Sequence, residues 1–167
     1  MNISIFGLGY VGCVTAACLA HDGHRVIGVD TNPNKVDLLN SGKSPLIEPG
    51  LEERIRDTVQ AGCLIATRDV DQAVRESEIS LICVGTPSNE NGSLDLQYVK
   101  NVCGQIGSAL ARKGQYHVVV VPSTVLPGTV EGQLIPILEQ ASGLKAGQDF
   151  GVCMNPEFLR EGTAIRD

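Results

Sequence analysis

Short apolar runs alternate with amphipathic stretches along the whole chain, and this alternation is the first indication of its fold. The runs at residues 79–84 and 118–121 are almost continuously apolar, as in central parallel strands that are buried on both faces. The expected strands are residues 3–6, 25–29, 64–67, 79–84, 117–121 and 149–153.

Helices are expected between these strands. The first extends over residues 11–21. The second begins at Asn32 and Pro33, a capping residue followed by proline at the first helical position, and continues to about Asn40. Apolar residues at helical spacing predict three more helices. Their buried stripes contain Leu51, Ile55 and Val59; Val99, Cys103, Ile106 and Leu110; and Val130, Leu134 and Leu138.

Strands that alternate with helices and are joined by right-handed crossovers form an α/β fold. We therefore predict a Rossmann-like, doubly wound parallel sheet with helices on both faces and the strand order 3-2-1-4-5-6. Tryptophan is absent and aromatic residues make up only 4%, so Val, Ile, Leu and Ala must form the core, as they do in such a sheet.

A glycine-rich turn directly follows the first strand, and an acid, Asp30, directly follows the second. Gly7 permits a tight turn, Gly9 leaves room for a pyrophosphate, and Gly12 lets the helix approach the sheet closely. Asp30 is placed to accept hydrogen bonds from ribose hydroxyls and would repel a 2′-phosphate, so NAD is the expected cofactor. The alternative is a packing turn beside an incidental surface aspartate.

Polar segments follow the fourth, fifth and sixth strands, at residues 85–88, 122–129 and 155–162. Ligands of open α/β sheets bind beyond the carboxyl ends of the strands, so these segments should converge with the glycine turn on one cleft. Thr86 could bind the cofactor's phosphate or ribose, or its hydroxyl could form a hydrogen bond with nearby backbone groups of the turn. Thr124 could hold the nicotinamide side or a catalytic water, or it could cap the next helix.

Four charged residues have two interpretations each. Lys35 could approach the adenosine end of the cofactor or remain an ordinary solvated lysine. Glu157 and Glu161 would share a face if their segment is helical, and two carboxylates in a cleft can divide the roles of acid and base. Solvated surface carboxylates are the alternative. Arg160 could bind a substrate phosphate or pair with a glutamate.

Composition and charge narrow the class of protein. Hydrophobic residues make up 43% of the 167 residues and charged residues 19%, which suits one globular domain and excludes a disordered chain. The formal charge of −6 argues against nucleic acid or an anionic membrane as a partner. The six cysteines match no zinc motif, and Cys13, Cys18 and Cys83 are expected to be buried as small hydrophobes. A reduced, cytoplasmic protein is the simpler interpretation.

Five segments together resemble the nucleotide-sugar 6-dehydrogenases, the UDP-glucose/GDP-mannose dehydrogenase family. They lie in family order over nearly the whole chain, and the last is the most specific, because a generic dinucleotide-binding domain has no need of it. The segments are residues 5–12, 47–51, 84–87, 123–129 and 155–162.

The resemblance implies an N-terminal NAD-binding domain, residues 1–167, of an enzyme that oxidises a sugar C6 hydroxyl to a carboxylate with two NAD. The family pathway passes through an aldehyde, a cysteine thiohemiacetal and a thioester that water hydrolyses. The cofactor contacts implied by motif are Tyr10, Val11, Asp30, Lys35, Thr86 and Thr124.

The last matching segment is similar to the loop that meets the sugar and its phosphates. It consists of Glu157, Phe158, Leu159, Arg160 and Glu161. The resemblance gives Glu161 a contact with the substrate. It also lets Thr124 and one of the two glutamates assist the catalytic water, and it leaves open which glutamate is the base.

The chain departs from the family pattern in one decisive respect. The family's nucleophilic cysteine lies in a later glycine-rich segment, and none of the six cysteines matches it by motif. The central helix, the catalytic lysine and the base-binding C-terminal domain have no counterpart either. We therefore expect part of a longer protein that is inactive by itself. The expected partner is a nucleotide sugar, with neither nucleic acid nor membrane, and the full-length protein is expected to form a homo-oligomer.

Residues 42–50 and 123–129 are closer to the GDP-mannose members of the family, and UDP-glucose is the alternative substrate. Two other classes are an NAD-sensing or interaction module and a β-hydroxyacid dehydrogenase. The segment 155–162 counts against both, because neither needs a second carboxylate loop.

Overall fold

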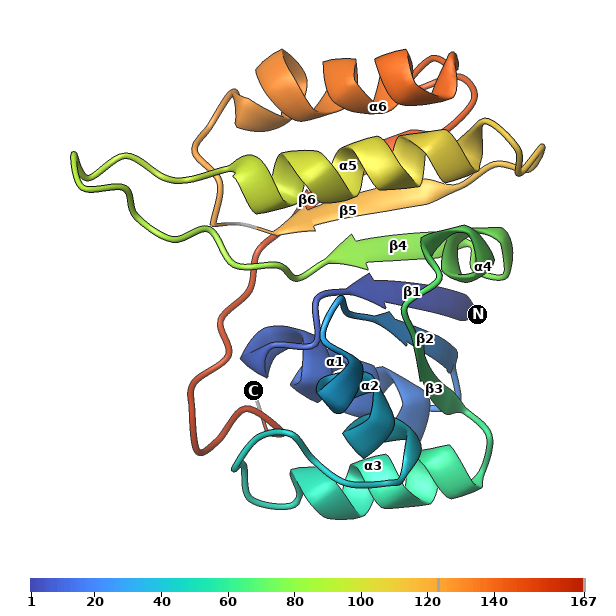
Figure 1. Ribbon diagram of the computed structural model, residues 1–167, viewed down its shortest axis with the longest axis vertical. Helices are drawn as coiled ribbons and strands as arrows, with labels where there is room; N and C mark the ends of the chain where they lie inside the picture. Colours follow the sequence, from blue (N-terminus) through green and yellow to red (C-terminus); the bar gives the residue numbers. More distant parts are fainter. Residues whose placement is uncertain (123, 167) are drawn as a thin grey trace.

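Six parallel strands form one sheet in the predicted order β3-β2-β1-β4-β5-β6 (Figure 1). The computed structural model describes residues 1–122 and 124–166. Ser123, which belongs to the predicted polar segment 122–129, and Asp167 lie outside the described residues. The strands are β1 (Asn2–Phe6), β2 (Arg25–Val29), β3 (Leu64–Thr67), β4 (Ile79–Ile82), β5 (Val118–Pro122) and β6 (Gly151–Asn155).

All of the predicted helices are present, together with one short helix that was not predicted. That helix is α4, and the Asp69 carboxylate caps it by accepting a hydrogen bond of 3.0 Å from the Gln72 N–H. The predicted cap of α2 is confirmed, because the Asn32 side chain accepts from the Asn34 N–H at 3.0 Å. The helical segments are α1 (Tyr10–His21), α2 (Pro33–Asn40), α3 (Leu51–Gln60), α4 (Val70–Arg75), α5 (Gln97–Leu110), the π-helical η1 (Val130–Leu134) and α6 (Ile135–Ser142).

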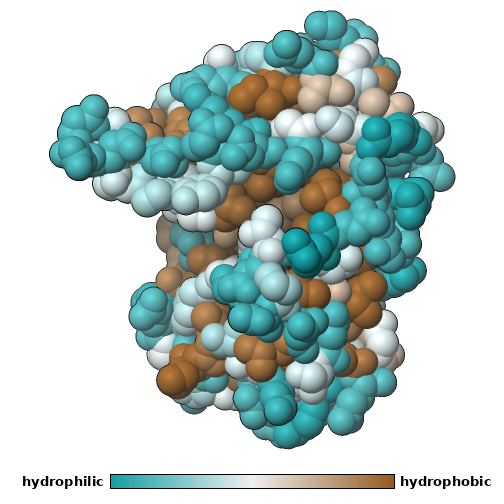
Figure 2. All heavy atoms as spheres, in the orientation of Figure 1, coloured by the Kyte–Doolittle hydropathy of each residue, from teal (hydrophilic) through white to brown (hydrophobic). Residues whose placement is uncertain are grey.

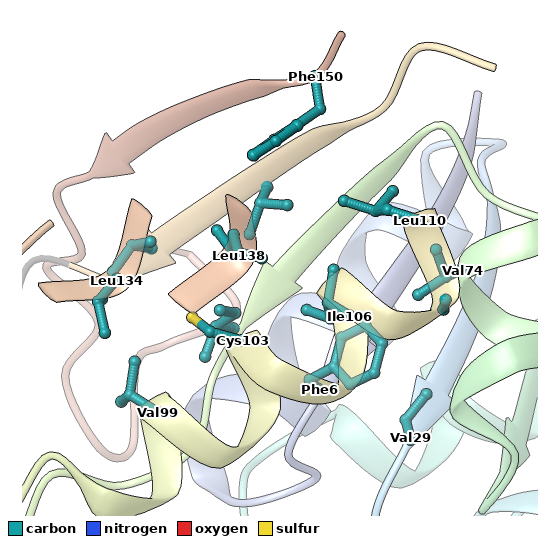
Figure 3. Close-up of a cluster of buried hydrophobic side chains, with 14 of the residues drawn as sticks. Phe6, Val29, Val74, Val99, Cys103, Ile106, Leu110, Leu134, Leu138 and Phe150 are labelled. Carbon is teal, nitrogen blue, oxygen red and sulfur yellow. The ribbon is translucent and has the colours of Figure 1, made fainter. Parts of the chain in front are cut away.

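Helices cover both faces of the sheet, and each face has its own apolar core. Neighbouring β1 residues show the division: Phe6 packs into the core beneath α4, α5 and α6, whereas Ile5 packs into the core beneath α1, α2 and α3. Fully burying one such side chain stabilises the fold by about 1.5–3 kcal/mol. Figure 3 shows that the predicted stripe of α5 is part of the first core; its members are Val99, Cys103, Ile106 and Leu110.

The carboxyl ends of β1, β4 and β5 point to the left in Figure 1, where two long segments leave the sheet. Residues 85–96 project as an arm between β4 and α5, and hydrophilic side chains cover this arm in Figure 2. Residues 156–166 descend from β6 toward α1 and α3. There Leu159 and Ile165 pack against the α1–α3 core, and Ala164 is buried in it. The chain thus crosses the whole edge of the sheet on which ligands are expected.

The amino ends of the strands contain a buried polar chain. The hydroxyl of Ser77 donates to Ser4 Oγ at 2.9 Å, Ser4 and Ser80 share a hydrogen bond of 2.7 Å, and Ser80 Oγ lies 2.7 Å from His117 Nε2. The ammonium group of Lys113 donates to the carbonyl oxygens of Val74 and Ser77 at the same end. Burial, assisted by the Lys113 charge, lowers the pKa of His117 to about 4, so its imidazole is neutral at pH 7.

Candidate dinucleotide-binding site

A cleft of about 590 Å³ opens at the carboxyl ends of β1, β2 and β4, where the connections leave for opposite faces of the sheet. This is the switch point at which doubly wound sheets bind ligands. Its lining combines the glycine turn, the end of β2, the β3–α4 connection, the end of β4 and one side of α5. Predicted residues among the lining are Gly7, Gly9, Asp30 and Lys35.

The three glycines of the turn have different geometric requirements. Gly7 has a φ of +99°, and a Cβ there would lie 2.9 Å from the backbone carbonyl carbon of Cys83. A Cβ on Gly12 would lie 1.8 Å from the carbonyl oxygen of Gly7, so α1 could not approach the turn as it does. A Cβ on Gly9 would meet no protein atom within 4 Å and would project beside the cleft. The predicted division of tasks among the glycines fits this geometry.

The amino end of α1 suits an anion. Gly9 occupies the position before the helix, no side chain caps the first turn, and that turn contains no acidic residue. The first N–H groups of a helix have no partner within the helix, and the helix dipole favours negative charge beside them. These features fit a pyrophosphate held by backbone N–H groups.

Asp30 links the end of β2 to the glycine turn. Its Oδ2 accepts a hydrogen bond of 2.8 Å from the Leu8 N–H, and its Oδ1 accepts one of 2.9 Å from the Asn32 N–H. The ammonium group of Lys35 lies 3.6 Å from Oδ2, and the Asp30 side chain is only 12% exposed. A carboxylate has about four acceptor positions, so these contacts leave capacity for ribose hydroxyls. Lys35 is thus an ion-pair partner that lines the cleft.

Two parts of the cleft wall were not predicted from the sequence. One side of α5 contributes Tyr98, Asn101 and Gln105, and the residue directly after β3 contributes Arg68. The α5 residues are spaced by three and four positions opposite the apolar stripe, which is the pattern of a second helical face. Arg68 occupies the carboxyl end of a parallel strand, as Asp30 does. Both patterns are present in the sequence.

The two predicted threonines differ in their surroundings. Thr86 directly follows the lining residue Gly85 and is half-buried, and its hydroxyl has no hydrogen-bond partner among residues 1–122 and 124–166. Thr124 is exposed, and the next helical segment begins at Val130, so Thr124 is not its cap. The predicted strand at residues 79–84 ends at Ile82, and Cys83 and Val84, which follow it, form part of the cleft wall.

The carboxylate segment is not helical. Residues 156–160 have no regular structure, and turns follow from Glu161 onward, so the condition under which Glu157 and Glu161 would share a helix face is not met. Glu157 is half-buried and its charge acts on the Cys83 thiol beside the cleft, whereas Glu161 is exposed and its charge acts on the Tyr10 hydroxyl. The two carboxylates therefore face different neighbours.

The other predicted residues of the carboxylate segment differ in their exposure to solvent. Phe158 is 82% exposed and Arg160 is exposed, whereas Leu159 is held in the α1–α3 core. Of the remaining predicted contacts, Tyr10 and Val11 form the first turn of α1 beside the cleft.

Three of the cysteines are poor nucleophiles. Burial raises the pKa values of Cys13, Cys83 and Cys103 to about 12, so these thiols remain protonated at neutral pH. The predicted burial is confirmed for Cys13, whereas Cys18 and Cys83 are only half-buried. Cys83 is partly open because it borders the cleft.

Two features are absent from the described part of the chain, a metal-binding cluster and a membrane-spanning helix. Among residues 1–122 and 124–166, no group of His, Cys, Asp and Glu side chains could hold a metal ion. Within the same residues, no helix has the length and apolar character needed to cross a bilayer.

The fold and the cleft define a dinucleotide-binding domain of the doubly wound class. Comparison with known proteins then identifies the family. Residues 1–167 match the NAD binding domain of the UDP-glucose/GDP-mannose dehydrogenase family, and the chain belongs to that family. NAD is therefore the cofactor of this domain.

Individual relatives are similar over the whole chain. GDP-mannose 6-dehydrogenase of Azotobacter vinelandii is 59% identical over 167 residues, and UDP-glucose 6-dehydrogenase of Haloferax volcanii is 42% identical over the same length. The crystal structure of a ternary complex of GDP-mannose dehydrogenase from Pseudomonas aeruginosa superposes with a TM-score of 0.99 at 59% identity. The chain covers 38% of each of these three proteins.

Proposed function

We propose that this domain serves an enzyme that oxidises the C6 hydroxyl of GDP-mannose to a carboxylate with two NAD. One observation carries the proposal: the chain is 58–59% identical over its whole length to GDP-mannose 6-dehydrogenases, against 41–44% for UDP-glucose dehydrogenases. UDP-glucose is the second candidate, since a relative that acts on it also matches all 167 residues.

The proposed reaction requires two oxidations at one carbon. The alcohol first gives an aldehyde, and the aldehyde then takes up one water and gives the carboxylate. Each NAD accepts one pair of electrons, so one sugar yields two NADH and three protons. A nucleophilic cysteine elsewhere in the full-length protein would hold the carbon between the two oxidations, because none of the six cysteines here matches the family's nucleophile by motif. Burial also keeps Cys13, Cys83 and Cys103 protonated.

The residues of this domain would bind the cofactor and border the reacting carbon. The first turn of α1 would bind the pyrophosphate through backbone N–H groups, and Asp30 would accept hydrogen bonds from the adenosine ribose. Thr86 would contact the cofactor from the end of β4. These roles are supported by the open space at Gly9 and by the acceptor capacity of the Asp30 carboxylate.

The segment that follows β6 would contact the substrate. Arg160 and Glu161 are exposed on the carboxyl edge of the sheet, where they can reach a nucleotide sugar bound next to the cofactor. We assign the catalytic water to Thr124 together with a glutamate. Glu157 is the better candidate for that glutamate, because its charge acts on Cys83 at the border of the cleft, whereas the charge of Glu161 acts on Tyr10.

An assay of the full-length protein tests the proposal. We expect two NADH per GDP-mannose consumed, and a kcat/KM for GDP-mannose at least about tenfold above that for UDP-glucose, which corresponds to a difference of about 1.4 kcal/mol in transition-state stabilisation. Residues 1–167 alone are expected to bind NAD without turnover. Faster oxidation of UDP-glucose would establish the second candidate. NAD binding without oxidation of any nucleotide sugar by the full-length protein would instead support a non-catalytic NAD-sensing module.

A further inference from the structure

Glu48 is a buried carboxylate that neither the cleft nor the proposed catalytic roles use. It lies in the connection between α2 and α3, and only 7% of the residue is exposed. Its Oε2 accepts hydrogen bonds from the Tyr10 hydroxyl at 2.6 Å and from the Gly162 N–H at 2.8 Å, and its Oε1 accepts from the Ala164 N–H at 3.1 Å. One side chain therefore holds segments that are far apart in the sequence.

Such an arrangement is energetically demanding, because a buried charge is tolerated only where hydrogen bonds compensate for the lost water. Hydrogen bonds to a carboxylate are about twice as strong as those between neutral groups. Partial burial and the hydrogen bond to Glu48 raise the pKa of Tyr10 to about 12, so its hydroxyl stays a donor over the working pH range. The network therefore has a single arrangement, in which the Tyr10 hydroxyl on one side and the N–H groups of Gly162 and Ala164 on the other all donate to Glu48.

The partners of Glu48 belong to the two halves of the proposed site. Tyr10 directly follows Gly9 in the first turn of α1, where the pyrophosphate is proposed to bind. Gly162 directly follows Glu161 in the carboxylate segment. The hydroxyl of Tyr10 also lies 3.5 Å from the carbonyl oxygen of Arg160, which joins the same two segments a second time.

We propose that Glu48 is a positioning residue that couples the cofactor turn to the carboxylate segment, so that binding of NAD and binding of the nucleotide sugar strengthen each other. A ligand that orders the first turn of α1 fixes the Tyr10 hydroxyl, and through Glu48 it fixes the backbone at Gly162 and Ala164. The coupling is reciprocal, since each ligand must change the affinity of the other by the same factor. This inference rests on the proposed function for the identity of the second ligand.

The test measures the dissociation constant of GDP-mannose for the full-length protein by calorimetry, without cofactor and with saturating NADH, so that no turnover occurs. Wild-type protein is expected to bind GDP-mannose at least about fivefold more tightly with NADH, which is the lower end of usual coupling. Tyr10→Phe removes one hydroxyl and Glu48→Gln removes the charge. In both variants, the ratio of the GDP-mannose dissociation constant without cofactor to that with NADH is expected to fall below about twofold. Glu53→Gln, on the exposed side of α3, is the matched control and should keep the wild-type ratio.

This ratio of dissociation constants shows whether Glu48 is a positioning residue or has a purely structural role. If Glu48 only stabilises the fold, the variants lose melting temperature but keep the wild-type ratio, and that result overturns the inference while the proposed function stands. Absence of coupling in the wild type overturns it as well. Should Glu48→Gln fail to fold, Tyr10→Phe still decides, because it keeps the ring and the backbone. Wild-type protein that binds neither GDP-mannose nor UDP-glucose would overturn the proposed function, and with it this inference.

Discussion

At the carboxyl ends of the strands polar groups surround an open cleft, whereas at the amino ends three serines and His117 form a closed chain inside the protein. The first group retains unused capacity: the first turn of α1 lacks a side-chain cap, and the Asp30 carboxylate can accept further bonds. In the second group, each serine hydroxyl bonds to a neighbour, whereas His117 Nδ1 is buried without a hydrogen-bond partner among the described residues.

This difference between the two ends of the sheet indicates which positions determine ligand affinity and which determine stability. Groups left unsatisfied by the protein cost little at an open edge, because water or a ligand completes them, whereas buried groups must be satisfied internally. Changes at the amino end should therefore alter stability without altering NAD affinity. Changes at the carboxyl end should mainly do the reverse, with exceptions at positions where the cleft wall is itself tightly packed.

The largest expected effect comes from such an exception. In Gly12→Ala the new methyl group would lie 1.8 Å from the carbonyl oxygen of Gly7, so α1 must move away from the turn. We expect this overpacking to lower the free energy of unfolding by about 3 kcal/mol or more, measured by urea denaturation.

Gly9→Ala is the matched control, because its methyl group would meet no protein atom within 4 Å. The stability of this variant should stay within about 0.5 kcal/mol of wild type. Its NAD affinity should nevertheless fall, since the methyl group occupies space beside the cleft. Equal stability losses in the two variants would contradict the assignment of different tasks to these glycines.

The next effect is a pH dependence that arises at the opposite end of the sheet. The pKa of His117 is lowered to about 4 in the folded protein, against 6.5 for an unperturbed histidine. The unfolded chain therefore takes up a proton first as the pH falls, so stability is complete above pH 6.5 and decreases between pH 6.5 and 4. The difference between the two pKa values corresponds to about 3 kcal/mol.

His117→Gln supplies the comparison for this effect, because it removes the titrating group. The difference in unfolding free energy between the variant and wild type should change over that pH range and should be constant above pH 7. NAD affinity at pH 7 should be the same in both proteins. A pH-independent difference would show that the buried imidazole has the same pKa folded and unfolded.

The sequence predicted those features that depend on neighbouring residues. The cap at Asn32 and the glycine turn follow from patterns that span a few residues, the strand order follows from the rules for right-handed crossovers in α/β chains, and the structure confirms all three. Helix α4 was missed because it has only six residues, too few for an apolar stripe to repeat. The polar wall of α5 was missed because periodicity was read only for apolar positions.

Side-chain contacts between distant segments could not be predicted. Glu48 and Gly162 are separated by 114 positions, and Glu48 and Ala164 by 116, so nothing in either local pattern indicates their hydrogen bonds. The same holds for the shape of residues 156–160. Their spacing allowed a helix, but Leu159 packs on the α1–α3 core, and the N–H groups of Gly162 and Ala164 just after the segment donate hydrogen bonds to Glu48. These contacts hold the segment in a non-helical conformation.

The smallest expected effect concerns a single carboxylate of the cleft. Asp30→Ala removes the acceptor proposed for the adenosine ribose and also the bond to the Leu8 N–H that steadies the glycine turn. We expect NAD affinity to fall about tenfold, which at saturating ligand reduces NAD-induced stabilisation by about 1.4 kcal/mol. The rise in melting temperature with NAD reports this loss within each variant, independently of any change in intrinsic stability.

Asp37→Ala is the control for charge, since Asp37 is exposed on α2 and does not line the cleft. Its response to NAD should equal that of wild type. A second measurement, the preference for NAD over NADP, tests whether the charge of Asp30 excludes a 2′-phosphate. In Asp30→Ala the carboxylate that repels this phosphate is gone, while Lys35 and Arg68 remain beside the site. The preference for NAD over NADP should therefore narrow in Asp30→Ala but not in Asp37→Ala. An unchanged preference would mean that selectivity lies in the shape of the cleft and not in the charge of Asp30.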